Sequence, residues 1–393
     1  MDEIKRLIDR HSEQTREDRR WLHAHPELAC HEVESSAYIA KTLREMGLEP
    51  KENVGGYGVT AVIAGTKGPG KCIGLRADFD ALPFTEKTGL ACASLNPGTM
   101  HACGHDVHAA MLLGAARVLN GMRDSFAGNV KLVFQPAEEN VITSGARSMI
   151  ADGALEDPKV DAMVGQHVWP GIDAGKVGVR NGAMMAASDR FFITVKGSAT
   201  HGSEPQNGVD AIVITGQVLS ALQTIVSRNV GPLDSAVVTV GNIHGGGAYN
   251  AVCDEVKMEG TCRNLNPEIR NAMPERIERI VRGVTESMGG GYEFRYVRGY
   301  SPTVNAPEMF ELVRDAVVDA GGMGALVVPE TPALGGEDFS FYCEKVPSAI
   351  FWLGCRHADR ERVPLHNAAF DPGEDIMPLG VEVLVRSALR FLK

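Results

Sequence analysis

Residues 100–116 read MHACGHDVHAAMLLGAA, which places a cluster of possible metal ligands directly before an apolar run typical of a helix. Thiolate and neutral imidazole are groups that borderline-soft divalent metal ions prefer, and Cys103 and His105 bring two of them to one point of the chain. A buried cysteine beside surface histidines would explain isolated residues, but the density of this cluster favours a metal site. We expect the helix over residues 107–120, with Cys103 and His105 in the loop before it.

Strand-like and helical segments alternate on both sides of this stretch. Helical periodicity is found from the N-terminus to about Leu22 and again over residues 35–46 and 144–151. Strands are predicted by short apolar or β-branched runs at residues 59–63, 72–75, 130–134 and 162–165. This alternation predicts a mostly parallel sheet with covered faces, and in such sheets ligands bind beyond the carboxyl ends of the strands.

The middle of the chain has a different order of elements. Residues 190–297 read as strand, helix, strand, strand, helix, strand, which is typical of a ferredoxin-like domain. After residue 303 the alternation resumes, with a helix over 307–320, a strand over 349–353 and a terminal helix over 375–392. We therefore expect one α/β domain formed by residues 1–184 and 300–393, interrupted by an inserted domain at residues 185–299.

The composition excludes several classes of function. A hydrophobic content of 44% with 23% charged residues is that of a soluble globular protein, and the net charge of −11 without a basic block argues against nucleic-acid binding. No apolar run approaches the roughly 20 residues that span a bilayer, and the N-terminus begins a charged amphipathic helix instead of a signal peptide. Eight scattered cysteines without C-x-x-C pairs fit reduced thiols, so we expect a cytoplasmic protein.

Further possible ligands follow predicted strands or lie near the C-terminus. Glu138 and Glu139 end the stretch FQPAEE; since neighbouring side chains diverge, one can bind a metal ion while the other acts as a base on a metal-bound water. His167 comes immediately after a predicted strand. Two metal ions that share one ligand and a water could be held by five residues: Cys103, His105, Glu139, His167 and His366.

A series of motifs resembles the dinuclear metal amidohydrolases. This family of carboxypeptidase- and aminoacylase-like enzymes includes hippurate hydrolase, bacterial N-acyl-L-amino-acid amidohydrolases and plant auxin-conjugate hydrolases. The resemblance extends from His25 to His366. Its motifs, in chain order, are LRADFDALP (75–83), HACGHDVH (101–108), FQPAEE (134–139), GQHVWP (165–170), the loop of His201, GGGAYNAV (245–252) and GGEDFSF (335–341).

The resemblance implies a role for each candidate residue. Cys103, His105, Glu139, His167 and His366 would be the metal ligands, with Cys103 bridging. Glu138 would be the general base. Asp78 and Asp80 would accept the other N–H of metal-bound imidazoles. Contacts to the substrate would come from His201, Asn250 and Arg263, and in relatives the counterpart of His201 reaches the active site of the partner subunit. The inserted domain would serve as lid and homodimer interface, or as part of a higher homo-oligomer.

The expected reaction is hydrolysis of the amide bond of an N-acyl (aroyl or acetyl) amino acid. Glu138 would take the proton of the attacking water, His201 would steady the oxyanion, and Asn250 and Arg263 would hold the substrate carboxylate. The residues after His201, from Gly202 to Gln206, depart from the usual pattern of the family, so the acyl and amino-acid preferences stay open.

Three alternatives differ in substrate or in class. A dipeptidase or carboxypeptidase of the same family would use the same chemistry on a peptide bond. A catalytically silent binding protein is disfavoured because every ligand and Glu138 are present. A structural zinc site is disfavoured because such sites are closed cages of four ligands without a free carboxylate beside them. Mixed Cys, His and carboxylate sites accept Zn, Mn, Co or Ni, so two divalent ions of open identity are expected.

Overall fold

The computed structural model describes residues 2–393, and the chain divides into two compact units. The first, here called the α/β unit, runs to Met184 and includes Thr303–Thr331 and Asp338–Lys393. The second, here called the inserted unit, consists of Met185–Pro302 with Pro332–Glu337.

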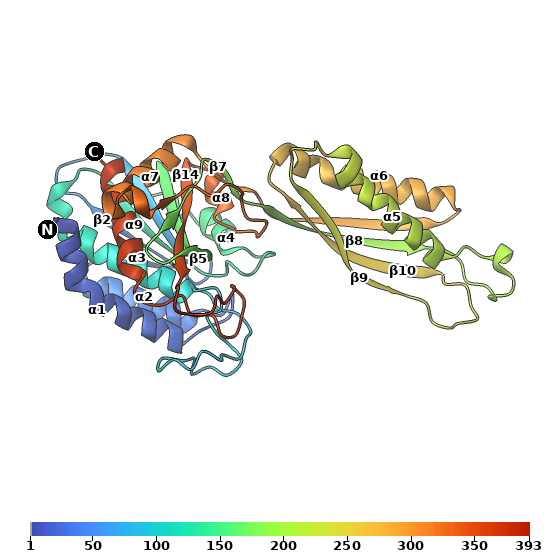
Figure 1. Ribbon diagram of the computed structural model, residues 1–393, viewed down its shortest axis with the longest axis horizontal. Helices are drawn as coiled ribbons and strands as arrows, with labels where there is room; N and C mark the ends of the chain where they lie inside the picture. The colour runs from blue at the N-terminus through green and yellow to red at the C-terminus, as the bar shows by residue number, and fades with distance from the viewer. Residues whose placement is uncertain (1) are drawn as a thin grey trace. The chain divides into compact units, whose positions relative to one another are not determined.

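An eight-stranded sheet forms the centre of the α/β unit (Figure 1). Its four adjacent strands β4, β3, β5 and β14 are parallel, whereas β1, β2 and the β14–β6 pair are antiparallel. The predicted mostly parallel sheet is therefore confirmed. In spatial order the strands are β1 (Lys51–Val54), β2 (Gly58–Ala64), β4 (Asn129–Gln135), β3 (Cys72–Asp78), β5 (Ala162–Asp173), β14 (Ser348–Arg356), β6 (Val177–Gly178) and β13 (Leu326–Val327).

Helices pack on this sheet and on one another. The most deeply buried is α3, in which 14 residues of 17 are buried, and it packs against α1, α9 and strand β3. Gly114 allows the close approach of α1, because a Cβ atom there would lie 2.8 Å from Thr15 Oγ1. The helices of this unit are α1 (Glu3–Ala24), α2 (Val33–Glu45), α3 (His105–Gly121), α4 (Gly145–Ala151), α7 (Pro307–Gly321), α8 (Ser340–Cys343) and α9 (Met377–Phe391).

Two predicted boundaries near the site were wrong. Helix α3 begins at His105, so this residue lies in the first turn and not in the preceding loop. Gly104 ends the loop in a left-handed conformation (φ 84°), and a Cβ atom there would lie 2.6 Å from Val168 Cγ2. Strand β5 continues to Asp173, so His167 lies within it, because β14 keeps pairing with it beyond residue 165 and aligns His167 with Trp352.

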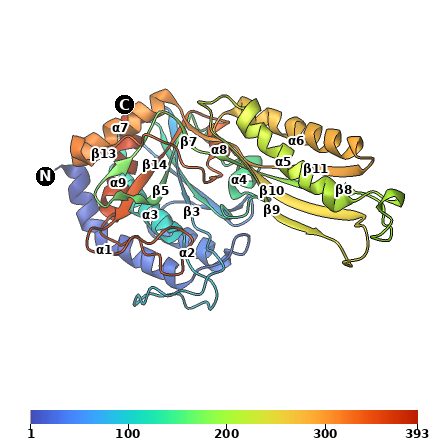
Figure 2. The same ribbon diagram turned by 45° about the vertical axis from the view of Figure 1, so that its right-hand side comes forward.

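The inserted unit has the element order β-α-β-β-α-β (Figure 2). Its four antiparallel strands are arranged in the order β11-β8-β10-β9, and both helices pack on one face of the sheet around a separate apolar core. The elements are β8 (Ala187–Lys196), α5 (Ala211–Asn229), β9 (Ala236–Gly245), β10 (Glu255–Asn264), α6 (Pro267–Ser287) and β11 (Gly291–Tyr300). Elsewhere, β7 (Gly182–Met185) pairs with β12 (Thr303–Asn305).

Helix α5 is long and rich in apolar residues, although Gly, Thr, Ser and Gln interrupt its apolar positions. Among residues 2–393 it alone is long and apolar enough to cross a bilayer by length and composition. Its buried residues Ile214, Val218, Leu222 and Ile225 follow helical spacing, and they pack on the sheet of the inserted unit.

Candidate metal centre

The structure brings the five candidate ligands together at the carboxyl end of the parallel strands. The Cys103 Sγ atom lies 3.4 Å from His167 Nε2, and His366 Nε2 lies 3.0 Å from Glu139 Oε1. The possible ligand atoms of Cys103, His105 and His167 are all within 4.8 Å of one another, as are those of Cys103, Glu139 and His366. Cys103 therefore belongs to both groups.

Elements far apart in sequence deliver these side chains. Strands β3, β4 and β5 are parallel, so Asp78, Gln135 and His167 approach the same edge of the sheet. The His366 loop is attached to the Cys103 loop by a hydrogen bond from the His366 N–H to the Ala102 carbonyl, 2.8 Å long. The His366 side chain is half exposed, so the cluster is open to solvent on this side.

The hydrogen bonds around the histidines leave a nitrogen of each ring for a ligand. Nδ1 of His105 contacts the Asp80 carboxylate (3.1 Å) and carbonyl (3.0 Å), while its buried Nε2 has no hydrogen-bond partner among the described residues. Nδ1 of His167 donates to the Val168 carbonyl at 2.7 Å, which leaves Nε2 facing Cys103. A buried nitrogen without a partner, aimed at a thiol and carboxylates, fits a metal ion.

Asp78 and Asp80 form hydrogen bonds with different histidines. Asp80 holds His105 and also accepts the Glu139 N–H at 2.9 Å. Asp78 is hydrogen-bonded to His108 at 2.5 Å, and His108 Nε2 in turn accepts the Val168 N–H at 2.9 Å. Asp78 also lies 3.9 Å from His105 Nε2 and forms a ligand-like group with His105 and His108 that the sequence did not suggest.

Burial and the local carboxylates shift the pKa values of this cluster. Burial raises the pKa of the Cys103 thiol well above its usual value, and the charges of Glu139 and Glu138 add to this effect. Burial lowers the pKa of His167 well below its usual value. For His105, burial opposes protonation, but the charges of Asp78 and Asp80 outweigh it and raise the pKa to about 10. The surroundings of His105 thus favour a positive charge, which a divalent ion would supply.

Glu138 is buried at the same cluster. Its carboxylate oxygen, that of Glu139 and a His105 nitrogen all lie within 4.8 Å of one another. The expectation that neighbouring carboxylates diverge is therefore too simple here. Ala137 before them has a positive φ of 53°, which sets the direction in which the segment that carries both side chains leaves the end of β4.

A buried polar network that the sequence analysis missed supports the strand ends. Arg76 bonds to Asp78 (2.6 Å), Gln135 (2.9 Å) and Asp338 (2.8 Å), and Asp338 also accepts from Ser144 Oγ (2.8 Å) and the Ala146 N–H (3.0 Å). Asp338 belongs to the GGEDFSF motif. The available signal was Arg76 itself, a charged residue in a strand that is otherwise apolar apart from its terminal Asp78.

Two of the three candidate substrate contacts lie together in the inserted unit. Nδ1 of His201 is 2.6 Å from Ser203 Oγ, and the loop of His201 pairs with that of Asn250 through the Gly202 N–H and the Asn250 carbonyl, 2.7 Å apart. Arg263 lies near the opposite end of β10, where it contacts Ser188. At about 3.3 Å per residue, Arg263 is roughly 26 Å along the strand from Glu255, which follows the Asn250 loop.

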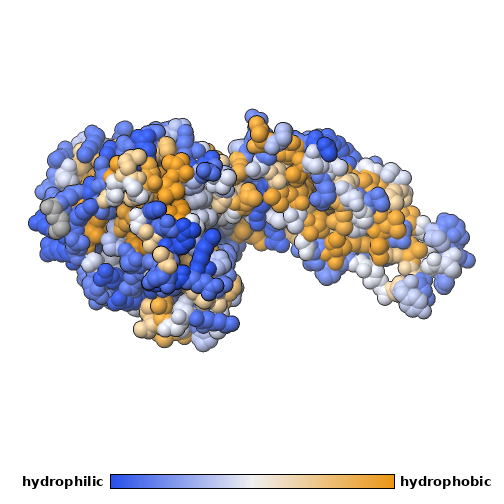
Figure 3. All heavy atoms as spheres, in the orientation of Figure 1, coloured by the Kyte–Doolittle hydropathy of each residue, from blue (hydrophilic) through white to orange (hydrophobic). Residues whose placement is uncertain are grey.

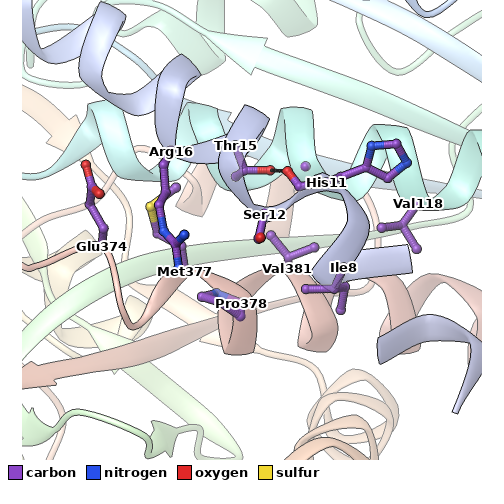
Figure 4. Close-up of a pocket in the computed structure, with 11 residues that line it drawn as sticks. Ile8, His11, Ser12, Thr15, Arg16, Val118, Glu374, Met377, Pro378 and Val381 are labelled. Carbon is purple, nitrogen blue, oxygen red and sulfur yellow. Dashed lines mark hydrogen bonds between the residues drawn. The ribbon is translucent and has the colours of Figure 1, made fainter. Parts of the chain in front are cut away.

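A crevice between α1, α3 and α9 is separate from this cluster (Figure 4). Its walls combine core side chains such as Ile8, Val118 and Val381 with polar ones that include His11, Arg16 and Glu374. None of the five candidate ligands lines it.

Comparison with known proteins shows the family of this chain. A family profile described as peptidase family M20/M25/M40 matches residues 74–390. The chain belongs to this family. It is therefore an M20-family hydrolase, and its α/β fold with a mostly parallel central sheet is that of its relatives.

Relatives of this M20 hydrolase include both types of enzyme considered above. The N-acyl-L-amino acid amidohydrolase of Geobacillus stearothermophilus is 42% identical, over 78% of this chain and 82% of that protein. Thermostable carboxypeptidase 1 of Saccharolobus solfataricus is 38% identical, over 95% of this chain and 94% of that protein. The crystal structure of the Bacillus subtilis YXEP protein, described as a dinuclear metal-binding peptidase, is similar with a TM-score of 0.84 at 34% identity, over 98% of this chain and 99% of that one.

Proposed function

We propose that this M20 hydrolase is a metal-dependent amidohydrolase that releases free amino acids from N-acyl amino acids. The observation that carries the proposal is the convergence of five possible ligands with one further buried carboxylate, Glu138. The name of the Geobacillus relative supports the substrate class.

The donor set supports two divalent ions for each subunit. Cys103 belongs to two ligand groups, one with His105 and His167 and one with Glu139 and His366, which supports it as the shared ligand. His105 Nε2, which has no hydrogen-bond partner among the described residues, supports metal binding by the group of Cys103, His105 and His167. The description of the YXEP protein supports a dinuclear centre. We infer zinc, manganese, cobalt or nickel, because all four accept mixed thiolate, imidazole and carboxylate ligands.

The bound ions would polarise the amide carbonyl and lower the pKa of a water from ~15.7 toward ~7. Glu138 would take a proton from the attacking water and would then deliver it to the leaving nitrogen. Asp80 keeps Nδ1 of His105 occupied, so that only Nε2 faces the site. Asp78 positions His108 and, through it, the Val168 backbone next to His167.

His201 steadies the developing oxyanion, while Asn250 and Arg263 hold the substrate carboxylate. The separation along β10 means that a small substrate within one protomer cannot contact both ends of this strand. We therefore infer that His201 and Asn250 act at the site of a second copy.

The surface of the inserted unit supports a homodimer. From Ala211 to Ser227, α5 carries no charged residue, and Ile212 and Val213 on it are each about half exposed. In Figure 3, apolar residues gather on the side of the inserted unit that carries α5. Strand β9 is an edge strand, whose free backbone groups can pair with a second copy. This unit would then act as lid and dimerisation domain.

A cytoplasmic location is supported by the cysteines. All eight are free thiols in the structure, five of them buried, and a reducing compartment keeps thiols in that state.

A substrate panel tests the reaction. After reconstitution with each metal ion alone, the enzyme should hydrolyse benzoyl-, acetyl- or indole-acyl amino acids faster than dipeptides. The reverse ranking would favour the carboxypeptidase or dipeptidase alternative, to which the Saccharolobus relative points. Glu138→Gln should lower kcat by ~10³-fold without changing the metal content. Absence of activity on every N-acyl amino acid would overturn the proposal.

A further inference from the structure

Glu32 is a buried carboxylate outside the proposed ligand set. It is fully buried just before α2, and its Oε1 accepts the backbone N–H of Ala137 at 2.7 Å. Its Oε2 has no hydrogen-bond partner among residues 2–393. Since a buried carboxylate oxygen without a partner destabilises the fold, the position of Glu32 requires an explanation.

Its partner Ala137 has a strained backbone conformation. The φ of 53° lies in the left-handed region, which residues with a Cβ atom rarely adopt. Both backbone groups of Ala137 are engaged, because Glu32 accepts its N–H and the Gly145 N–H donates to its carbonyl at 3.1 Å. Gly145 is packed so closely that a Cβ atom there would lie 1.6 Å from the Pro136 carbonyl oxygen.

This strained residue directly precedes the two adjacent carboxylates. In an extended chain, the side chains of Glu138 and Glu139 would point to opposite sides. Here their oxygen atoms lie within 4.8 Å of each other and of the His105 imidazole. The loop is held by carboxylates at two points, Glu32 at Ala137 and Asp80 at the Glu139 N–H (2.9 Å).

We propose that Glu32 is a positioning residue that holds Ala137 in its left-handed conformation and thereby directs Glu138 and Glu139 to the same metal site. The inference rests on the proposed function, since the roles of Glu138 and Glu139 are assigned there. Glu32 acts through the backbone of Ala137 and touches neither substrate nor metal.

The electrostatics of Glu32 agree with this role. Burial and the nearby charge of Asp80 raise the pKa of Glu32 to about 7, so its ionised form is disfavoured where it sits. Carboxyl groups in such unfavourable surroundings are typical of functional sites.

Four variants test the proposal. Glu32→Ala removes the acceptor, Glu32→Asp withdraws it by one methylene, and Glu32→Gln keeps a carbonyl oxygen at the same reach. Glu32→Ala combined with Ala137→Gly removes the acceptor but supplies a residue that adopts positive φ without a steric cost. Glu34→Ala is the matched control, because Glu34 is an exposed glutamate two residues further along.

The measurements are kcat and KM on an N-acyl amino acid, calorimetric titration of the metal-free protein with Mn²⁺ alone, and the unfolding temperature. We expect Glu32→Ala to lower kcat by ~10- to 100-fold, with KM within about threefold, since misplacement of a catalytic group by ~1 Å costs up to ~10²-fold. One Mn²⁺ binding step should weaken by about tenfold. Glu32→Gln should stay within about threefold of wild type, Glu32→Asp should fall between, and Ala137→Gly should restore at least about fivefold of the lost kcat.

Two results would overturn the proposal. One is a Glu32→Ala enzyme that matches Glu34→Ala in kcat and Mn²⁺ binding. The other is a loss that neither Ala137→Gly nor Glu32→Gln repairs, which indicates a merely structural residue. If Glu32→Ala does not fold, a Glu32→Asp enzyme equal to Glu32→Gln in kcat and Mn²⁺ binding would likewise contradict it. If wild type hydrolyses no N-acyl amino acid, the proposed function fails, but Mn²⁺ titration of the same variants still decides the role of Glu32.

Discussion

The candidate residues of the α/β unit and those of the inserted unit are held in opposite ways. Cys103, His105 and Glu138 are buried, and their neighbours Asp80, Arg76 and Glu32 are buried as well. His201 and Asn250, in contrast, lie in exposed loops whose contacts are mostly local. A preorganised cluster suits residues that hold metal ions and move a proton, whereas exposed loops suit residues that meet a substrate or a second subunit.

Removal of the metal ions should have the largest effect on turnover, because the ions are expected to bind at the buried cluster of the α/β unit. Chelation should abolish turnover, and adding back a divalent ion should restore it. Burial raises the pKa of Cys103 and the nearby carboxylates raise that of His105, so at neutral pH both are protonated in the metal-free protein and must lose protons when metal binds. Binding should therefore weaken as the pH falls. Calorimetry in buffers of different ionisation enthalpy measures the proton release, and Cys103→Ser should release fewer protons than wild type.

Loss of His201 should have the next largest effect on activity. The same variant tests whether His201 acts in the site of the partner subunit. His201→Ala should lower kcat by ~10²- to 10³-fold without changing the metal content. If His201 acts in the partner's site, a 1:1 mixture of His201→Ala and Glu138→Gln subunits, unfolded and refolded together, should recover about a quarter of wild-type activity. Half of the dimers are then mixed, and one of their two sites is intact. A mixture as inactive as its two components would show that His201 acts within its own chain.

The buried charges around His23, which include Asp106 next to the candidate ligand His105, should contribute to stability in a pH-dependent way. Burial opposes protonation of His23, but Asp106 at 2.8 Å and Glu86 at 3.1 Å raise its pKa to about 9. A raised histidine pKa stabilises the fold fully below pH 6.5, and the contribution is lost as the pH rises through 9. His23→Gln should therefore lower the free energy of unfolding by up to about 3 kcal/mol at pH 6, and by much less at pH 10. Denaturant unfolding at both values measures it, and a loss independent of pH would contradict the assignment.

The smallest expected effect concerns the exposed face of the inserted unit. Ile212→Glu places a charge on the uncharged face of α5 and should weaken self-association by about tenfold, equivalent to ~1.4 kcal/mol. Sedimentation at several concentrations measures this, with Gln14→Glu, a residue of α1 in the α/β unit, as a comparison for added charge. Activity should fall only under conditions where the variant is monomeric. An unchanged monomer–dimer equilibrium would exclude this face as the interface.

Much of the fold was predictable because its signals are local. The alternation of strands and helices indicated the mostly parallel sheet, and the separate run from β8 to β11 indicated an inserted unit. The motifs also nominated the five candidate ligands and Glu138, since thiol, imidazole and carboxylate groups are conspicuous after apolar strands. The start of α3 at His105 was missed, because a left-handed Gly104 packed against Val168 depends on a contact distant in sequence.

The sequence by itself thus determined the order of elements and the chemical groups available, because both depend on side-chain type and on spacing along the chain. Only the tertiary structure decided which carboxylate meets which histidine, with Asp80 on His105 and Asp78 on His108. It alone showed that oxygen atoms of Glu138 and Glu139 lie close to one another and to His105, that Ala137 before them has a positive φ and donates its N–H to Glu32, and that the candidate residues His201 and Arg263 lie near opposite ends of β10. These are contacts between segments tens to hundreds of residues apart, and they arise only when packing closes the chain on itself.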